Sequence, residues 1–181
     1  NAACVAKYWF EKFGVRCDVE IASEYRYRQH VINDGTLFVT ISQSGETLDT
    51  MAALGMAKGL GYIASLCICN VAESSLVRAS DLTIFTRAGR EIGVASTKAF
   101  TTQLVTLLMI AICLRRRRIG DGRTPDDVET KIVQELRTLP QQIENIFELE
   151  HEIIAMSKHF ADKQHTLFLG RGTHYPIAVE G

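Results

Sequence analysis

The chain has 181 residues, of which 46% are hydrophobic and 23% are charged, a mixture typical of globular proteins and not of disordered ones. Twenty basic and twenty-one acidic side chains leave a formal net charge of −1. A protein that neutralises many nucleic-acid phosphates needs an excess of basic residues. We therefore expect a folded protein with no nucleic-acid partner.

The N-terminal residues predict the middle of a helix, and they lack the basic segment and apolar core of a signal peptide. At the other end, Pro176 predicts a helix start that runs for only two turns before the last residue. We therefore expect this chain to be part of a longer protein.

Short apolar runs that are rich in β-branched and aromatic residues predict strands. Residues 37–41, 63–69, 82–85 and 166–169 lack strict polar alternation, which indicates burial on both faces, whereas residues 17–21 alternate and suit a strand nearer an edge. Helical patterns cover residues 48–60 and 96–116. The alternation of strands and helices predicts an α/β fold, a three-layer doubly wound parallel sheet.

The second of these helices contains the apolar run 104–114, followed by Arg115–Arg118. A membrane-spanning helix needs about twenty apolar residues, so this shorter run predicts a buried core helix and no membrane partner. The arginines are then most simply the solvated end of the helix, where cations interact favourably with the dipole. A nucleic-acid signal is the alternative reading of the arginines.

The pattern changes after residue 120. Thr124 as a cap and Pro125 at the first helical position predict the start of a charged helical segment that reaches residue 165 and is broken once, at Pro140. A strand and a new helix start then repeat the opening of an α/β unit. We predict a first domain over 1–118, a helical connector over 119–164 and the beginning of a second domain over 165–181.

The five cysteines include Cys67 and Cys69 in one apolar run, where a thiol behaves as a small hydrophobe. No C-x-x-C pair occurs, and the histidines are scattered along the chain. We therefore expect buried reduced thiols, a reducing cytoplasmic location, and neither a metal nor a cofactor.

The loop 42–47, SQSGET, follows a predicted buried strand and leads directly into a helix. Ligands of parallel α/β sheets bind at this kind of position. Hydroxyl groups and the free N–H groups of a helix N-terminus favour an anion, and the absence of lysine excludes a Walker A site. Four or five such contacts predict millimolar to micromolar binding of a phosphorylated metabolite. Alternatively, Ser44 simply caps a helix that begins at Glu46.

A second candidate segment, 91–100, also follows a predicted strand and leads into a helix. Its small residues would let the backbone approach a ligand, and Ser96 or Thr97 would either cap the helix or hold a sugar hydroxyl. Lys98 opposes the helix dipole slightly, so a partner or a role for it is plausible, although solvent exposure is the simpler reading. Ser44 lacks the G-x-S-x-G context of a nucleophile elbow, so we do not expect a serine hydrolase.

Longer strings at residues 17–28, 41–50 and 91–103 resemble the sugar isomerase (SIS) domain family, whose fold is flavodoxin-like. Within it they resemble the isomerase half of the glutamine–fructose-6-phosphate aminotransferases. The closing string 168–181 is similar to the start of that family's second SIS domain. The likeness runs along the whole chain in order and is weakest over 115–131.

The resemblance implies conversion of fructose 6-phosphate and glutamine to glucosamine 6-phosphate and glutamate, for UDP-N-acetylglucosamine synthesis. It also implies a glutaminase domain in the full-length chain and a homodimer. Catalytic residues of the family would lie outside this chain, and Cys4 is not the glutaminase nucleophile. By resemblance, the sugar phosphate would contact Ser42, Gln43, Ser44, Thr47, Val94 and Ser96.

Two other functions stay open. A non-catalytic SIS module that senses a sugar phosphate would use the same loop. A structural half of an oligomer would leave the loop empty.

Overall fold

The computed structural model describes residues 1–93, 96–120 and 124–181. Its sheet consists of three parallel strands, β1 (Leu37–Ser42), β2 (Ala64–Cys69) and β3 (Leu82–Phe85), in the order β1-β2-β3. The register pairs Ser42 with Cys69, and Cys69 with Phe85, at the last residue of each strand. The loops that follow the three strands therefore lie along one edge of the sheet, the carboxyl edge.

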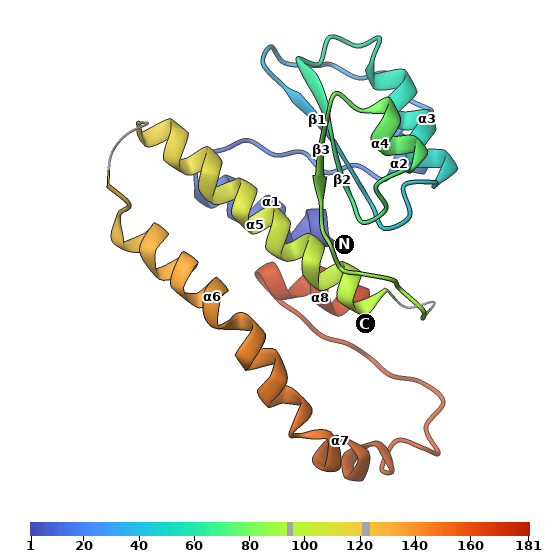
Figure 1. Cartoon of the computed structure of the whole chain (residues 1–181). Helices are drawn as coiled ribbons and strands as arrows, with labels where there is room; N and C mark the ends of the chain where they lie inside the picture. Colours follow the sequence, from blue (N-terminus) through green and yellow to red (C-terminus); the bar gives the residue numbers. More distant parts are fainter. Residues whose placement is uncertain (94–95, 121–123) are drawn as a thin grey trace.

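Helices cover both faces of the sheet (Figure 1), which confirms the predicted three-layer α/β fold. On one face, α1 (Ala2–Lys12) and α5 (Thr97–Ile119) pack around Ile68. On the other face, α3 (Leu48–Ala57) and α4 (Ser75–Ala79) pack around Cys67 and Cys69, beside the short α2 (Ala22–Tyr25). Successive strand side chains point to opposite faces, so both cysteines share one core, where they are buried free thiols as predicted.

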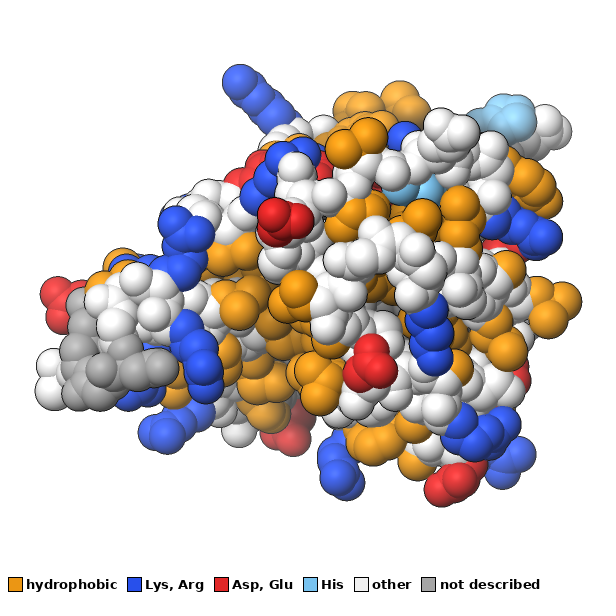
Figure 2. All heavy atoms as spheres, turned by 90° about the horizontal axis from the view of Figure 1, so that it is seen from above, with side chains coloured by type: hydrophobic (Ala, Val, Ile, Leu, Met, Phe, Trp, Pro, Cys, Tyr) orange, Lys and Arg blue, Asp and Glu red, His pale blue; other side chains and the backbone are white. Residues whose placement is uncertain are grey.

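Helix α5 has the length and apolar composition that a membrane span requires. In the fold, however, Leu107 and Ala111 of this helix are buried against Ala2, Ala6 and Phe10 of α1. This contact makes α5 a core helix, as predicted. Its arginine-rich last turn lies at the left-hand end of the molecule in Figure 2, where basic side chains gather at the surface.

Two predicted strands are wrong. Residues 17–21 and 166–169 form no strand, because neither segment has a neighbouring strand among the described residues, and a strand is stabilised by its ladder of hydrogen bonds. Within the alternating segment 17–21, Cys17 packs against the core beside α1 and α5, whereas Ile21 is 70% exposed. Leu167 and Leu169 are 80% and 83% exposed.

The C-terminal third consists of helices and one long irregular segment, and its middle part extends away from the sheet (Figure 1). It comprises α6 (Asp127–Phe147), α7 (Glu150–Ser157), the short 3-10 turn η1 (Gly172–His174) and α8 (Tyr175–Glu180). The predicted break at Pro140 is wrong, because α6 continues through it and ends at Phe147. A proline removes one backbone donor, and nearby Gln142 and Thr138 add a side-chain hydrogen bond of 3.2 Å to this turn.

The cap of α6 also differs from the prediction. Asp126, not Thr124, is the N-cap, and its carboxylate accepts a hydrogen bond from the Glu129 N–H at 2.9 Å. The same carboxylate contacts both terminal nitrogens of Arg115 on α5, at 3.1 and 2.6 Å. A threonine hydroxyl cannot form this second, ionic contact, so tertiary structure decides where the helix begins.

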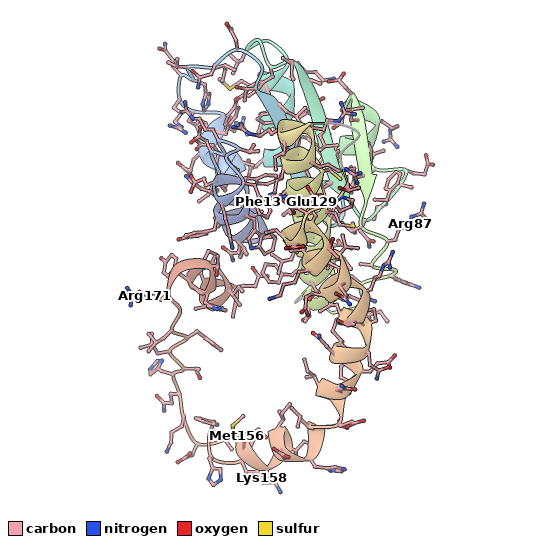
Figure 3. All side chains as sticks on the ribbon, turned by 90° about the vertical axis from the view of Figure 1, so that its left-hand side faces the viewer. Phe13, Arg87, Glu129, Met156, Lys158 and Arg171 are labelled. Carbon is pink, nitrogen blue, oxygen red and sulfur yellow. The ribbon has the colours of Figure 1, made fainter. Side chains whose placement is uncertain are left out.

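Arg115 of α5 contacts residues at the end of α1 and at the start of α6, so it links three helices. Its guanidinium lies 5.7 Å from the ring centre of Phe13, just past the end of α1, and 3.1 Å from the Glu129 carboxylate on α6. Figure 3 shows the labelled Phe13 and Glu129 in this region, with the rest of α6 and α7 projecting below. The chain then returns to α1, where the Asn1 amide donates to Glu180 of α8 at 2.8 Å. The division into 1–118, 119–164 and 165–181 stays a prediction.

Candidate functional site

The loop between β1 and α3 turns sharply at Gly45, whose φ is +68°. The Gly45 N–H donates to the Ser42 hydroxyl oxygen at 2.9 Å, and that oxygen lies 3.5 Å from the Thr47 hydroxyl. Ser42 is only 7% exposed, whereas Thr47 is exposed. The buried Ser42 hydroxyl therefore stabilises the turn through its hydrogen bond with Gly45, while Thr47 stays exposed at the surface.

Helix α3 begins at Leu48, with Thr47 as its N-cap residue and no side-chain cap. The Ser44 hydroxyl accepts from the Glu46 N–H at 3.2 Å, which is one turn too early to cap α3. The alternative in which Ser44 caps a helix from Glu46 is thus wrong. The first N–H groups of α3 remain as a partial positive charge directed toward the loop, an arrangement that favours an anion.

Glu46 caps a different helix. Its carboxylate accepts from the Ser75 N–H at the start of α4, at 2.7 Å, and the Leu76 N–H donates to the Gly45 carbonyl at 3.1 Å. The backbone N–H and the hydroxyl of Ser75 hold the pKa of Glu46 below its usual value. Glu46 therefore stays ionised at α4 and leaves the N-terminus of α3 to another anion. Its partner is 29 positions away in the chain, so no local pattern could have indicated this contact.

Two arginines from other elements lie near the loop, although the loop itself contains none. Arg26 is 3.6 Å from the Asp49 carboxylate in the first turn of α3. Arg78 donates to the Ser75 hydroxyl at 3.2 Å, next to the contact with Glu46. Arg26 and Arg78 therefore offset the negative charges of Asp49 and Glu46 near the N-terminus of α3. Sequence analysis missed them because they come from α4 and from the segment after α2.

The third loop of the carboxyl edge, between β3 and α5, carries the other half of the predicted site. Ser96 is the half-buried N-cap residue of α5, without a side-chain cap, while the Glu91 carboxylate accepts from the Ala99 N–H at 3.2 Å. Lys98 is exposed, and its ammonium donates to the Arg90 carbonyl, so it does have a partner. Val94, the remaining predicted residue, lies outside the described residues.

The comparisons with known proteins match this architecture. The sequence model of the SIS domain matches residues 1–113, which is more than half of the chain. The chain belongs to the SIS domain family. It is 59% and 56% identical, over 99% of its length, to the isomerizing glutamine–fructose-6-phosphate aminotransferases of Vibrio cholerae and Haemophilus influenzae. It spans 29% of the length of each of these relatives.

A solved structure supports the same assignment. The C-terminal domain of glucosamine-fructose-6-phosphate aminotransferase from Francisella tularensis superposes with a TM-score of 0.93 and 50% sequence identity. The match covers 99% of this chain and 50% of that one. The SIS fold and the order of its elements are therefore shared along nearly the whole chain.

Within this SIS chain, the candidate site lies on the loops at the carboxyl edge of the sheet. The cavity of about 500 Å³ between α1 and α8 and that of about 410 Å³ between α5 and α6 are not lined by loop residues. Among the described residues, no three His, Cys, Asp or Glu side chains gather to hold a metal ion. The arrangement therefore offers hydrogen-bond donors to an anion at the surface.

Proposed function

We propose that this chain is the sugar-phosphate-binding part of the isomerase region of a glutamine–fructose-6-phosphate aminotransferase. Its substrate there is fructose 6-phosphate, and its product is glucosamine 6-phosphate. The observation that carries the proposal is the uncapped N-terminus of α3 at the carboxyl edge, with the hydroxyls of Ser44 and Thr47 beside it. The identity of 56–59% with named aminotransferases supports this enzyme over a non-catalytic sensing module.

The phosphate group would bind at the N-terminus of α3. There it would accept hydrogen bonds from the first N–H groups of the helix and from the hydroxyls of Ser44 and Thr47. Ser42 accepts from Gly45 and keeps its own O–H proton available for the ligand or for Thr47. Each contact contributes about 1 kcal/mol net, and somewhat more to a charged acceptor. Four or five contacts give about millimolar to micromolar affinity, which suits a substrate that must leave again.

The sugar would extend from the phosphate toward the third loop, where Ser96 and Val94 are its proposed neighbours, with Gln43 on the β1 side. No residue of this chain is proposed as catalytic. A glutaminase domain in the full-length chain, a homodimer and a cytoplasmic location complete the proposal. Sedimentation of the full-length enzyme at micromolar concentration tests the homodimer, and a monomer would contradict it.

An amide NMR titration of the 181-residue chain tests the binding site. We expect inorganic phosphate and fructose 6-phosphate each to shift the amides of residues 44–50. Thr47→Ala and Ser44→Ala should each weaken phosphate binding by about fivefold, which corresponds to about 1 kcal/mol. Ser42→Ala is a poorer test, because its hydroxyl also holds the Gly45 N–H.

Thr36→Ala is the matched control. Thr36 lies just before β1, at the opposite end of the strand, where its hydroxyl donates to the Asn33 carbonyl at 2.6 Å. This variant should bind phosphate like the unmodified chain. If neither ligand shifts the loop amides, the loop is empty and the chain is a structural element only.

A further inference from the structure

Asn70 lies between the two halves of the candidate site. It follows β2, the middle strand, so the loops after β1 and β3 flank it on either side. Its backbone N–H donates to the Gln43 carbonyl at 3.3 Å. Its side chain donates to the Gly89 carbonyl at 2.7 Å and accepts from the Ala88 N–H at 2.8 Å. One residue therefore links the phosphate loop to the loop that leads to Ser96.

The turn that Asn70 holds is unfavourable without support. Arg87 has a φ of +53°, in the left-handed region that residues with a Cβ seldom adopt, and Gly89 has a φ of +73°. Such conformations persist where the surrounding structure fixes them. Arg87 is exposed and its side chain points away from the sheet (Figure 3), so it does not anchor its own backbone there. The side-chain amide of Asn70 forms hydrogen bonds with Ala88 and Gly89, the two residues that follow Arg87, and these bonds hold the turn.

We propose that Asn70 is a positioning residue that sets the spacing between the phosphate loop and the sugar-facing loop. This inference rests on the proposed function, and it assigns different roles in the site to the backbone and to the side chain of Asn70. The backbone N–H of Asn70 contacts the phosphate loop, while its side chain holds only the third loop. Inorganic phosphate needs the first loop alone, whereas a sugar phosphate spans both. Loss of the side chain should therefore affect the two ligands differently.

The test compares inorganic phosphate and fructose 6-phosphate as probes of the 181-residue chain, by calorimetry and amide NMR. In Asn70→Ala, fructose 6-phosphate should bind about tenfold more weakly, because the sugar contacts are displaced, while phosphate affinity stays within about twofold. Equal weakening of both ligands in Asn70→Ala would overturn the proposal.

Ser65→Ala is the matched control. Ser65 is buried at the other end of β2, where its hydroxyl donates to the Asp81 carboxylate at 2.7 Å and accepts from the Asp81 N–H at 3.0 Å. The variant loses a comparable link between β2 and the segment before β3, but at the amino edge of the sheet. We expect it to bind both ligands normally. A selective loss of fructose 6-phosphate binding in Ser65→Ala would show that any weakening of the sheet has this effect.

A second variant tests the strained turn directly. Glycine adopts a positive φ without penalty, so Arg87→Gly should restore most of the fructose 6-phosphate affinity that Asn70→Ala loses. If the unmodified chain binds neither ligand, the proposed function fails. The positioning role is then judged from the amide signals of Ala88 and Gly89. Unchanged signals in Asn70→Ala would refute it, and large shifts confined to this turn would support it.

Discussion

Replacement of Gly45 by alanine tests the tight packing beneath the phosphate loop. A Cβ atom at this position would lie 2.1 Å from the Ser74 hydroxyl oxygen and 2.9 Å from the Cys69 sulfur. Both neighbours are buried, Ser74 at 1% and Cys69 at 0% exposure, so neither can move into solvent. The substitution also places an alanine at a φ of +68°.

The expected loss has two parts. An alanine in the left-handed region costs about 1–2 kcal/mol, and overpacking of a buried site costs a further ~1–3 kcal/mol. Gly45→Ala should therefore lower the free energy of unfolding by about 2–5 kcal/mol, a large share of the stability of a typical domain. Gly35 separates the two parts, because its φ is +75° and an added Cβ would meet nothing within 4 Å. Gly35→Ala should lose only about 1–2 kcal/mol.

Equilibrium unfolding in urea measures both variants, with stability compared at an unchanged dependence on denaturant. Because Ser74 or the loop must shift, Gly45→Ala should also weaken phosphate binding, while Gly35→Ala should bind normally. Equal losses of stability in the two variants would refute the reasoning. They would mean that the loop accommodates the extra carbon without displacing Ser74.

Two further predictions concern charged groups. Arg115→Met should lower the free energy of unfolding, because it removes the guanidinium that contacts Asp126, Glu129 and the Phe13 ring. The exposed Arg117→Met is the matched control and should stay within about 0.5 kcal/mol of the unmodified chain. Equal losses in urea unfolding would contradict the role of these contacts. The pKa of Glu46 is lowered in the folded chain, chiefly by the hydrogen bond from the Ser75 N–H. The ionised carboxylate therefore contributes fully to the stability of the fold above the pKa that Glu46 has in the unfolded chain. This contribution is lost as the pH falls through the lower pKa of the folded chain. The free energy of unfolding should fall more steeply from about pH 5 to about pH 3 in the unmodified chain than in Glu46→Gln. If the two proteins lose stability in parallel over this range, the hydrogen bond from Ser75 to the Glu46 carboxylate does not stabilise the fold.

Much of the site could be read locally. The apolar runs at residues 37–41, 63–69 and 82–85 were sufficient to predict the three strands of the sheet. The expected burial on both faces is correct for β2 but wrong for β3, an outer strand of the described sheet, where Leu82 is 55% exposed. The loop 42–47 was identified because its strand, its hydroxyls and its helix are adjacent in sequence. The string resemblance added the family, which the comparisons confirm.

The contacts that organise the site come from residues distant in sequence. Glu46 caps α4 and not its own helix, Asn70 joins two loops, and Arg26 reaches α3 from another segment. For the same reason the alternating residues 17–21 did not become a strand, since alternation describes one chain and pairing requires a second. The sequence by itself determined which residues can donate or accept hydrogen bonds, because this depends on residue type. Only the tertiary structure decided which of these groups meet, because their partners are brought together by strand order and helix packing.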